Sequence, residues 1–176
     1  MAQTDDSHGD SHGDSHGDSH GDSHGDDHGD SHGGERIVVG VDGSDASVAA
    51  LQWAADLASR IGASVEAVTT WQWPTGLGPD IPFPTGYDPA GDARGMLQAI
   101  VEPVAGRYPS VAVGSRILEG HAAEALVEAS RHADLLVVGS RGHGAFSGML
   151  LGSVSQHCAT HAASPVVIYR DRPVPD

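Results

Sequence analysis

The stretch Arg36-Ile37-Val38-Val39-Gly40-Val41-Asp42-Gly43-Ser44-Asp45 decides the fold. It opens with an apolar, largely β-branched run, which is typical of a strand buried on both faces of a parallel sheet. The polar residues at its end break the strand and offer helix N-caps. In residues 46–61 apolar side chains recur three and four positions apart, and Gly62 stands where helices commonly end in glycine. Residues 63–70 form a second apolar run, so the order predicts a right-handed parallel crossover.

The same alternation of strand and helix continues to the end of the domain. Residues 71–91 are rich in proline and glycine, so we expect a long surface loop that covers one edge of the sheet. Pro103 should kink or shorten the helix that follows. The pattern predicts an α/β fold, an open, doubly wound, parallel five-stranded sheet with helices on both faces. The remaining predicted elements are a helix at residues 92–108, a strand at 110–118, a helix at 122–130, a strand at 135–138, a helix at 153–162 and a strand at 166–169.

Composition narrows the class of protein. The chain has 176 residues, which fits one domain and a tail, and its formal net charge is −15. Its nine positive residues are all arginines, scattered from Arg36 to Arg172, so no basic stripe indicates nucleic-acid binding. No apolar run reaches the roughly 18 residues of a membrane span, and the acidic N-terminus lacks the apolar region of a signal peptide. We therefore expect a soluble, cytoplasmic protein with no membrane partner. Cys158 is the sole cysteine and fits a small buried apolar residue.

The N-terminal tail repeats the unit Ser-His-Gly-Asp from residue 7 onward. A glycine in every unit costs a helix about 1 kcal/mol relative to alanine, so we expect residues 1–34 to be disordered. Imidazole is a common ligand for Zn²⁺, Ni²⁺ and Cu²⁺, and histidine-rich tracts often bind such metals. Two interpretations stay open: a flexible metal-binding tail, or an acidic leader that only aids solubility. The histidines of the repeat are His8, His12, His16, His20, His24, His28 and His32.

The glycine-rich loop after the fourth predicted strand suits a phosphate. Doubly wound sheets bind ligands beyond the carboxyl ends of their strands. There the chain reads Gly139-Ser140-Arg141-Gly142, nine residues, then Gly152-Ser153 at a predicted helix start. Glycines let backbone amides approach a ligand, and a helix N-terminus favours an anion. Arg141 and His143 could add charge from the loop. The loop is neither a Walker A motif nor a GxGxxG fingerprint, and a merely tight connection remains the alternative.

The spacing of these glycines resembles the ATP-binding signature of the universal stress protein family. Three more segments resemble that family: Val39-Gly40-Val41-Asp42-Gly43-Ser44 its opening strand and loop, residues 133–139 its fourth strand, and residues 164–168 its closing strand. The resemblance covers residues 36–170 and leaves out the tail. It implies a sheet order of 3-2-1-4-5, a homodimer paired through residues 166–169, and a nucleotide-binding domain at residues 35–170 between the tail and a short extension at 171–176.

The resemblance also implies roles for single residues. Asp42 would face the ribose and adenine, the backbone of Thr70 would hold adenine, and Gly139 with Gly142 would shape the phosphate loop. Gly152, Ser153 and Val154 would bond the phosphates. One departure concerns the adenine contacts, because some ATP-binding members have Pro-Thr-Asp where this chain has Val-Asp-Gly-Ser.

Three functions remain open at the level of sequence. The first is an adenine-nucleotide-binding stress regulator or switch, with ATP as the expected ligand. The second is a slow ATP hydrolase in which Asp42 holds Mg²⁺ and His143 acts as a base, although we expect slow or absent hydrolysis. The third is a metal-storage protein that uses the α/β domain as a dimeric platform. His157 and His161, four positions apart, would permit a metal pair but fit helix-surface residues better.

Overall fold

A computed structural model describes residues 34–74, 85–142 and 150–170 of the chain. The histidine repeat, His143, part of the proline-rich loop and the last six residues lie outside the described residues. The elements are β1 (Arg36–Gly40), α1 (Asp45–Ile61), β2 (Ser64–Trp71), α2 (Pro89–Arg107), β3 (Val113–Glu119), α3 (Ala122–Ser130), β4 (Leu135–Gly139), α4 (Ser153–His161) and β5 (Val166–Tyr169).

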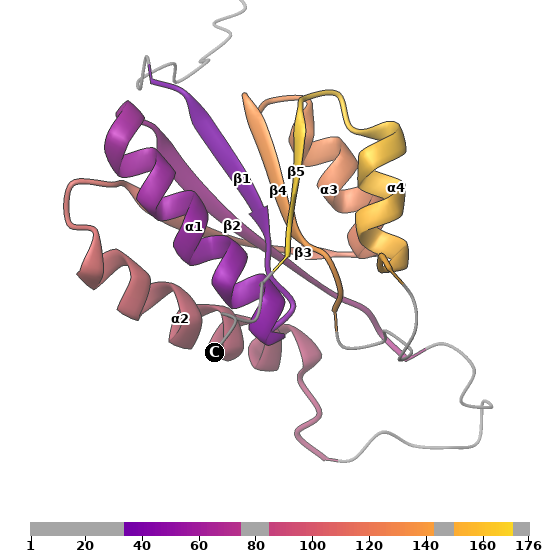
Figure 1. The fold of residues 1–176 in the computed structure, drawn as a ribbon. Coiled ribbons are helices and arrows are strands. Elements are labelled where there is room, and N and C mark those ends of the chain that lie inside the picture. Colours follow the sequence, from indigo (N-terminus) through magenta and orange to yellow (C-terminus); the bar gives the residue numbers. More distant parts are fainter. Residues whose placement is uncertain (1–33, 75–84, 143–149, 171–176) are drawn as a thin grey trace, which may run out of the picture. The chain divides into compact units, whose positions relative to one another are not determined.

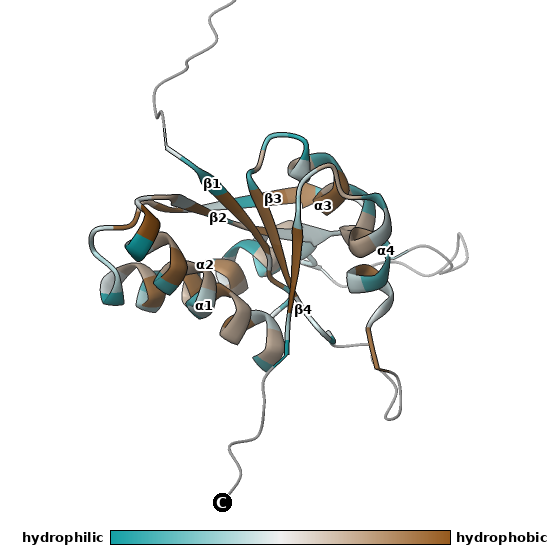
Figure 2. Cartoon of the chain, turned by 45° about the horizontal axis from the view of Figure 1, so that its top comes forward, coloured by the Kyte–Doolittle hydropathy of each residue, from teal (hydrophilic) through white to brown (hydrophobic). Residues whose placement is uncertain are grey.

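The five strands form one parallel sheet in the order β3-β2-β1-β4-β5 (Figure 1). Helices α1 and α2 cover one face, and α3 and α4 cover the other. The predicted fold class and sheet order are therefore confirmed. Strands β1 and β4 lie in the middle of the sheet and are its most buried elements, because helices pack against both of their faces. Figure 2 shows the same pattern as apolar colouring along these strands.

The ends of α1 follow the expected local chemistry. The Ser44 hydroxyl accepts a hydrogen bond from the Ser47 amide at 3.3 Å and caps the helix N-terminus. At the other end Gly62 has a φ of 76°, a left-handed conformation that costs glycine little. Between the caps, alanines 50, 54, 55 and 58 are fully buried, so small side chains let the helix lie close to the sheet.

Helix α2 departs from the sequence prediction at its start and in its middle. It begins at Pro89, within the expected loop, because the Asp88 carboxylate accepts a hydrogen bond from the Gly91 amide and Pro89 occupies the first turn. Pro103 does not shorten it: the helix continues to Arg107. Buried Leu97 and Val104 anchor it on either side of that proline.

Strand β3 also begins later than predicted, at Val113 in place of residue 110. The chain before it forms a turn in which the Val111 amide donates to the Tyr108 carbonyl, so Val111 is buried without being part of the strand. The other boundaries agree with the predictions to within one residue or coincide with them, a difference that helix and strand ends commonly show. Across the described parts of the chain, no helix is both long and apolar enough to cross a membrane.

Candidate functional site

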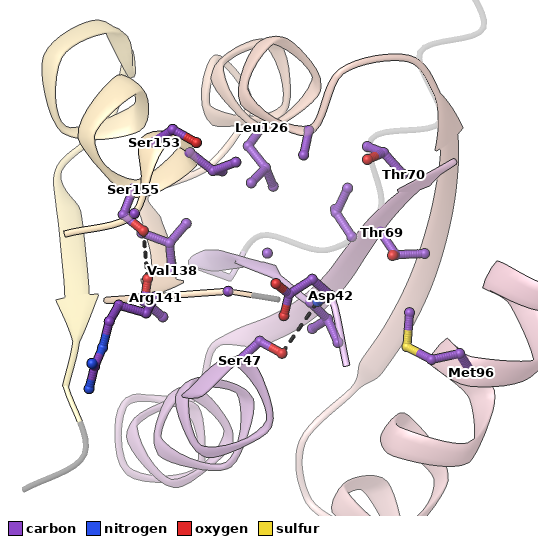
Figure 3. A pocket seen from close by; sticks show the side chains of 18 residues that line it. Asp42, Ser47, Thr69, Thr70, Met96, Leu126, Val138, Arg141, Ser153 and Ser155 are labelled. Atoms are coloured by element: carbon purple, nitrogen blue, oxygen red, sulfur yellow. Dashed lines mark hydrogen bonds between the residues drawn. The ribbon is translucent and has the colours of Figure 1, made fainter. Parts of the chain in front are cut away.

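A cavity of about 540 Å³ opens at the carboxyl ends of β1, β2 and β4 (Figure 3). Its volume lies within the range of about 300–1,000 Å³ that is usual for small-molecule sites. Every residue of the domain that the sequence singled out as nucleotide-binding lines this cavity, except His143, which lies outside the described residues. Those that line it are Asp42, Thr70, Gly139, Arg141, Gly142, Gly152, Ser153 and Val154.

The end of β1 opens a gap between β2 and β4. The Val41 amide donates to the Val68 carbonyl at 2.9 Å, and beyond this bond the chain turns into the loop before α1. In a parallel ladder, alternate residues direct both backbone groups to the same neighbour. Thr70 therefore points its N–H and C=O in the same direction as Val68, into the space where β1 has already ended.

Asp42 organises the loop between β1 and α1. Its Oδ1 accepts hydrogen bonds from the Ser44 amide at 3.0 Å and from the Ser44 hydroxyl at 2.6 Å. Its own amide donates to the Ser47 hydroxyl at 3.3 Å. Of the polar residues that follow β1, Ser44 and not Asp42 is the N-cap of α1. Asp42 instead holds the cap residue in place while its carboxylate borders the cavity (Figure 3).

Two glycines, Gly139 at the end of β4 and Gly142 in the loop that follows, are closely packed. A Cβ on Gly139 would lie 3.0 Å from the carbonyl carbon of Ala46 and 3.1 Å from the Ser47 nitrogen, so the first turn of α1 leaves no room for a side chain. A Cβ on Gly142 would overlap Oδ2 of Asp42. The glycine loop and the loop after β1 thus meet at this point, although they are far apart in the sequence.

The start of α4 is fixed to the end of β4. The Gly152 amide donates to the Ser140 carbonyl at 2.9 Å, and the buried Ser155 hydroxyl donates to the Gly139 carbonyl at 2.6 Å. The Gly152 amide is therefore already engaged. Gly152 is the N-cap and offers no side chain to the helix, so no side-chain cap satisfies the first-turn amides of Ser153 and Val154 within the described structure. These amides and the helix dipole make this wall attractive to an anion.

The sequence did not identify the apolar part of the cavity. It is supplied by two strands, by the residue that follows β1, and by helices α2 and α3: Val68, Val138, Val41, Met96 and Leu126. The alternation of β2 could have indicated Val68, but nothing local marks Met96 or Leu126, because only the packing of the helices brings them to the strand ends. The side chain of Arg141 is exposed and extends away from the middle of the cavity (Figure 3).

The remaining candidates lie elsewhere. The rings of His157 and His161 stack with centroids 4.2 Å apart, and His161 Nδ1 bonds the His157 carbonyl at 3.0 Å. Within residues 34–74, 85–142 and 150–170, no group of three or more His, Cys, Asp or Glu side chains is placed to hold a metal ion. Cys158 is buried between α4 and the sheet, and burial raises the pKa of its thiol to about 11.

Comparison with known sequences assigns the domain. The profile of the universal stress protein family matches residues 34–170. The chain belongs to the universal stress protein family. A universal stress protein of Mycolicibacterium smegmatis is 40% identical over 138 residues, which cover 77% of this chain and 46% of that protein. Universal stress protein Rv2623 of Mycobacterium tuberculosis is 38% identical over 144 residues, covering 77% and 45%. The chain thus spans about half the length of these relatives.

Solved universal stress protein structures share the fold. UspA from Lactobacillus plantarum aligns with a TM-score of 0.63 at 22% identity, over 77% of this chain and 97% of that one. A universal stress protein crystallised in complex with cAMP aligns with a TM-score of 0.56 at 28% identity, over 77% of this chain and 95% of that one.

Proposed function

We propose that this universal stress protein domain binds an adenine nucleotide in the cavity, with ATP as the expected ligand, and that it acts as a regulator or switch in a stress response. One observation carries the proposal. A single cavity joins an apolar gap, bordered by the free backbone edge at Thr70, to the uncapped first turn of α4 behind the glycine loop. A base and a phosphate chain need these two environments side by side.

The gap beyond β1 suits the base. Its apolar walls can cover the faces of a purine, and Val41, Val68 and Leu126 are themselves buried side chains. Adenine carries a ring-nitrogen acceptor next to its amino donor. The N–H and C=O of Thr70 form the complementary donor and acceptor, so backbone atoms alone can recognise the base.

The wall formed by α4 suits the phosphates. The amides of Ser153 and Val154 and the Ser153 hydroxyl are the donors at this wall, and Gly142 leaves room for close approach. Asp42 is the one acidic side chain among the described residues that line the cavity. Mg²⁺ on a nucleotide is usually held by one or two carboxylates together with the phosphates, so Asp42 is the residue that would meet the cation.

The relatives support the ligand class. The universal stress protein that shares 28% identity with this chain was crystallised in complex with cAMP, an adenine nucleotide. ATP and cAMP share the base and the ribose and differ in the phosphates. The gap at Thr70 would serve either ligand, whereas the wall at Ser153 would distinguish them.

Binding can be tested directly. Mass spectrometry of the purified chain would identify a copurified nucleotide, and calorimetry with ATP, ADP, AMP and cAMP would rank the ligands. We expect ATP to bind and phosphate release in a single turnover to be slow or absent. A chain that binds none of the four nucleotides would contradict the proposal, and fast phosphate release would favour the alternative of an ATP hydrolase.

Two further features complete the proposal. The backbone pairing with β4 uses Pro165 and Tyr169, so Val166 and Ile168 direct their backbone groups to the open edge of the sheet. We propose that this β-branched edge pairs with a second copy in a two-fold symmetric dimer, since an open edge of this kind is normally covered.

We also propose that the histidine repeat binds Ni²⁺, Zn²⁺ or Cu²⁺, which leaves a metal-storage role as the alternative function.

A further inference from the structure

Thr69 carries a hydroxyl that the fold itself does not use and that is still open to the cavity. The residue is 4% exposed, and its Oγ1 has no hydrogen-bond partner among the residues that the structure describes. Buried hydroxyls normally have a partner, because leaving one unsatisfied costs about 1–3 kcal/mol. Two buried serines near the strand ends have their hydroxyls used by the fold: Ser47 and Ser155 both donate to backbone carbonyls.

The Thr69 side chain lines the cavity at its apolar end. Along β2, Val65 and Ala67 face α1 and α2, so the alternation places Thr69 on the same side. There it lies near Met96 of α2, on the opposite side of the strand from Leu126 (Figure 3). In the free protein, water in the cavity can satisfy the hydroxyl, but a ligand that fills this end displaces that water.

We propose that the Thr69 hydroxyl is a specificity-determining contact to the base of the bound nucleotide. The inference rests on the nucleotide site proposed above and extends it from the backbone of Thr70 to the side chain of its neighbour. A base that offers a hydrogen-bonding atom at this position keeps the hydroxyl satisfied. A ligand that presents only apolar surface there leaves it unpaired, so the hydroxyl rejects such ligands.

The two adjacent threonines separate a side-chain contact from a backbone contact. Thr70 is only half-buried, so water can reach its hydroxyl whether or not a ligand is bound. Its contribution to binding comes from the backbone, which substitution by valine retains. Thr69 has the opposite assignment: its backbone groups point toward β3, where Thr69 pairs with Ile117, so it is the side chain with its hydroxyl that lines the cavity.

The test is calorimetric titration of the full chain with AMP, ADP and ATP. Thr69→Val replaces the hydroxyl by a methyl group of similar size and should weaken all three nucleotides about tenfold, or about 1.4 kcal/mol. Thr69→Ser keeps the hydroxyl and should stay within threefold of the unaltered chain. Thr160→Val removes an exposed hydroxyl on α4, away from the cavity, and serves as the matched control with unchanged affinity. Thr69→Val should also melt at about the same temperature as the unaltered chain, because the hydroxyl has no partner within the described part of the fold.

The outcomes separate the two proposals. If the unaltered chain binds none of the nucleotides, the nucleotide site itself is rejected. If it binds them and Thr69→Val binds equally well, only the role of the hydroxyl is rejected. A loss confined to ATP would place the effect at the phosphates and overturn the base contact, as would a larger loss in Thr70→Val than in Thr69→Val. A lower melting temperature in Thr69→Val would show that the hydroxyl stabilises the fold.

Discussion

The contact between Gly142 and Asp42 gives the sharpest test of the phosphate loop. Gly142→Ala adds a single Cβ, which would overlap Oδ2 of Asp42. Making room for the Cβ moves this carboxylate, whose Oδ1 accepts the hydrogen bonds from the amide and hydroxyl of Ser44, and so weakens them. These bonds are exposed to water, so we expect about 1 kcal/mol of lost stability, which corresponds to a few degrees in melting temperature.

The same substitution should weaken ATP binding at least tenfold, or about 1.4 kcal/mol. The added Cβ narrows the approach to the loop, and the displaced carboxylate no longer borders the cavity in its original position. Calorimetry on the folded variant measures this loss. Gly106→Ala is the matched control, because a Cβ at that position in α2 meets nothing within 4 Å.

A double-mutant cycle identifies the mechanism. In an Asp42→Ala background the Cβ at position 142 has room, so Gly142→Ala should cost clearly less affinity than it does in the unaltered chain. A coupling of about 1 kcal/mol would assign the effect to the contact with Asp42. Additive losses would mean that the Cβ blocks the ligand directly. An affinity within twofold of the unaltered chain in folded Gly142→Ala would refute the assignment of this loop to the phosphates.

Three further predictions concern other parts of the chain. Light scattering at micromolar concentration should give twice the chain mass, and Ile168→Pro, which removes an amide directed at the open edge of β5, should give a monomer; a monomeric unaltered chain would contradict the dimer. The full chain should bind several equivalents of Ni²⁺ or Zn²⁺ at pH 7.5 and lose them by about pH 5, because protonated imidazole, with a free pKa of about 6.5, cannot coordinate a metal. A variant lacking residues 1–34 should bind far less metal, and undiminished binding would place the ligands in the domain. Because the pKa of Cys158 is raised from 9.0 to about 11 in the folded state, the thiol stabilises the fold fully below pH 9, and this stability is lost as the pH rises from 9 to 11. Denaturant unfolding should show a steeper loss over this interval than in Cys158→Ala, and equal slopes would contradict the assignment.

Local sequence signals were enough for most of the elements. The runs that became β1 and β4 are apolar and β-branched on both faces, which few conformations other than a buried parallel strand accommodate. Helix α1 carries its start and stop signals at Ser44 and Gly62, next to the residues they act on. The start of α2 was also encoded locally, in Asp88 and Pro89, but the surrounding prolines and glycines obscured it.

The sequence by itself determined which residues form the sheet and which glycines surround the start of α4, because those signals act between near neighbours in the chain. Only the tertiary structure decided which side chains meet in the cavity. Packing brings Met96 and Leu126 to the strand ends, and it sets Gly142 against Asp42. The direction of β2 and the end of β1 decide that Thr70 offers its backbone to the gap while Thr69 offers its hydroxyl. Two identical, adjacent residues thereby acquire different environments, because successive residues of a strand face opposite sides of the sheet and opposite neighbouring strands.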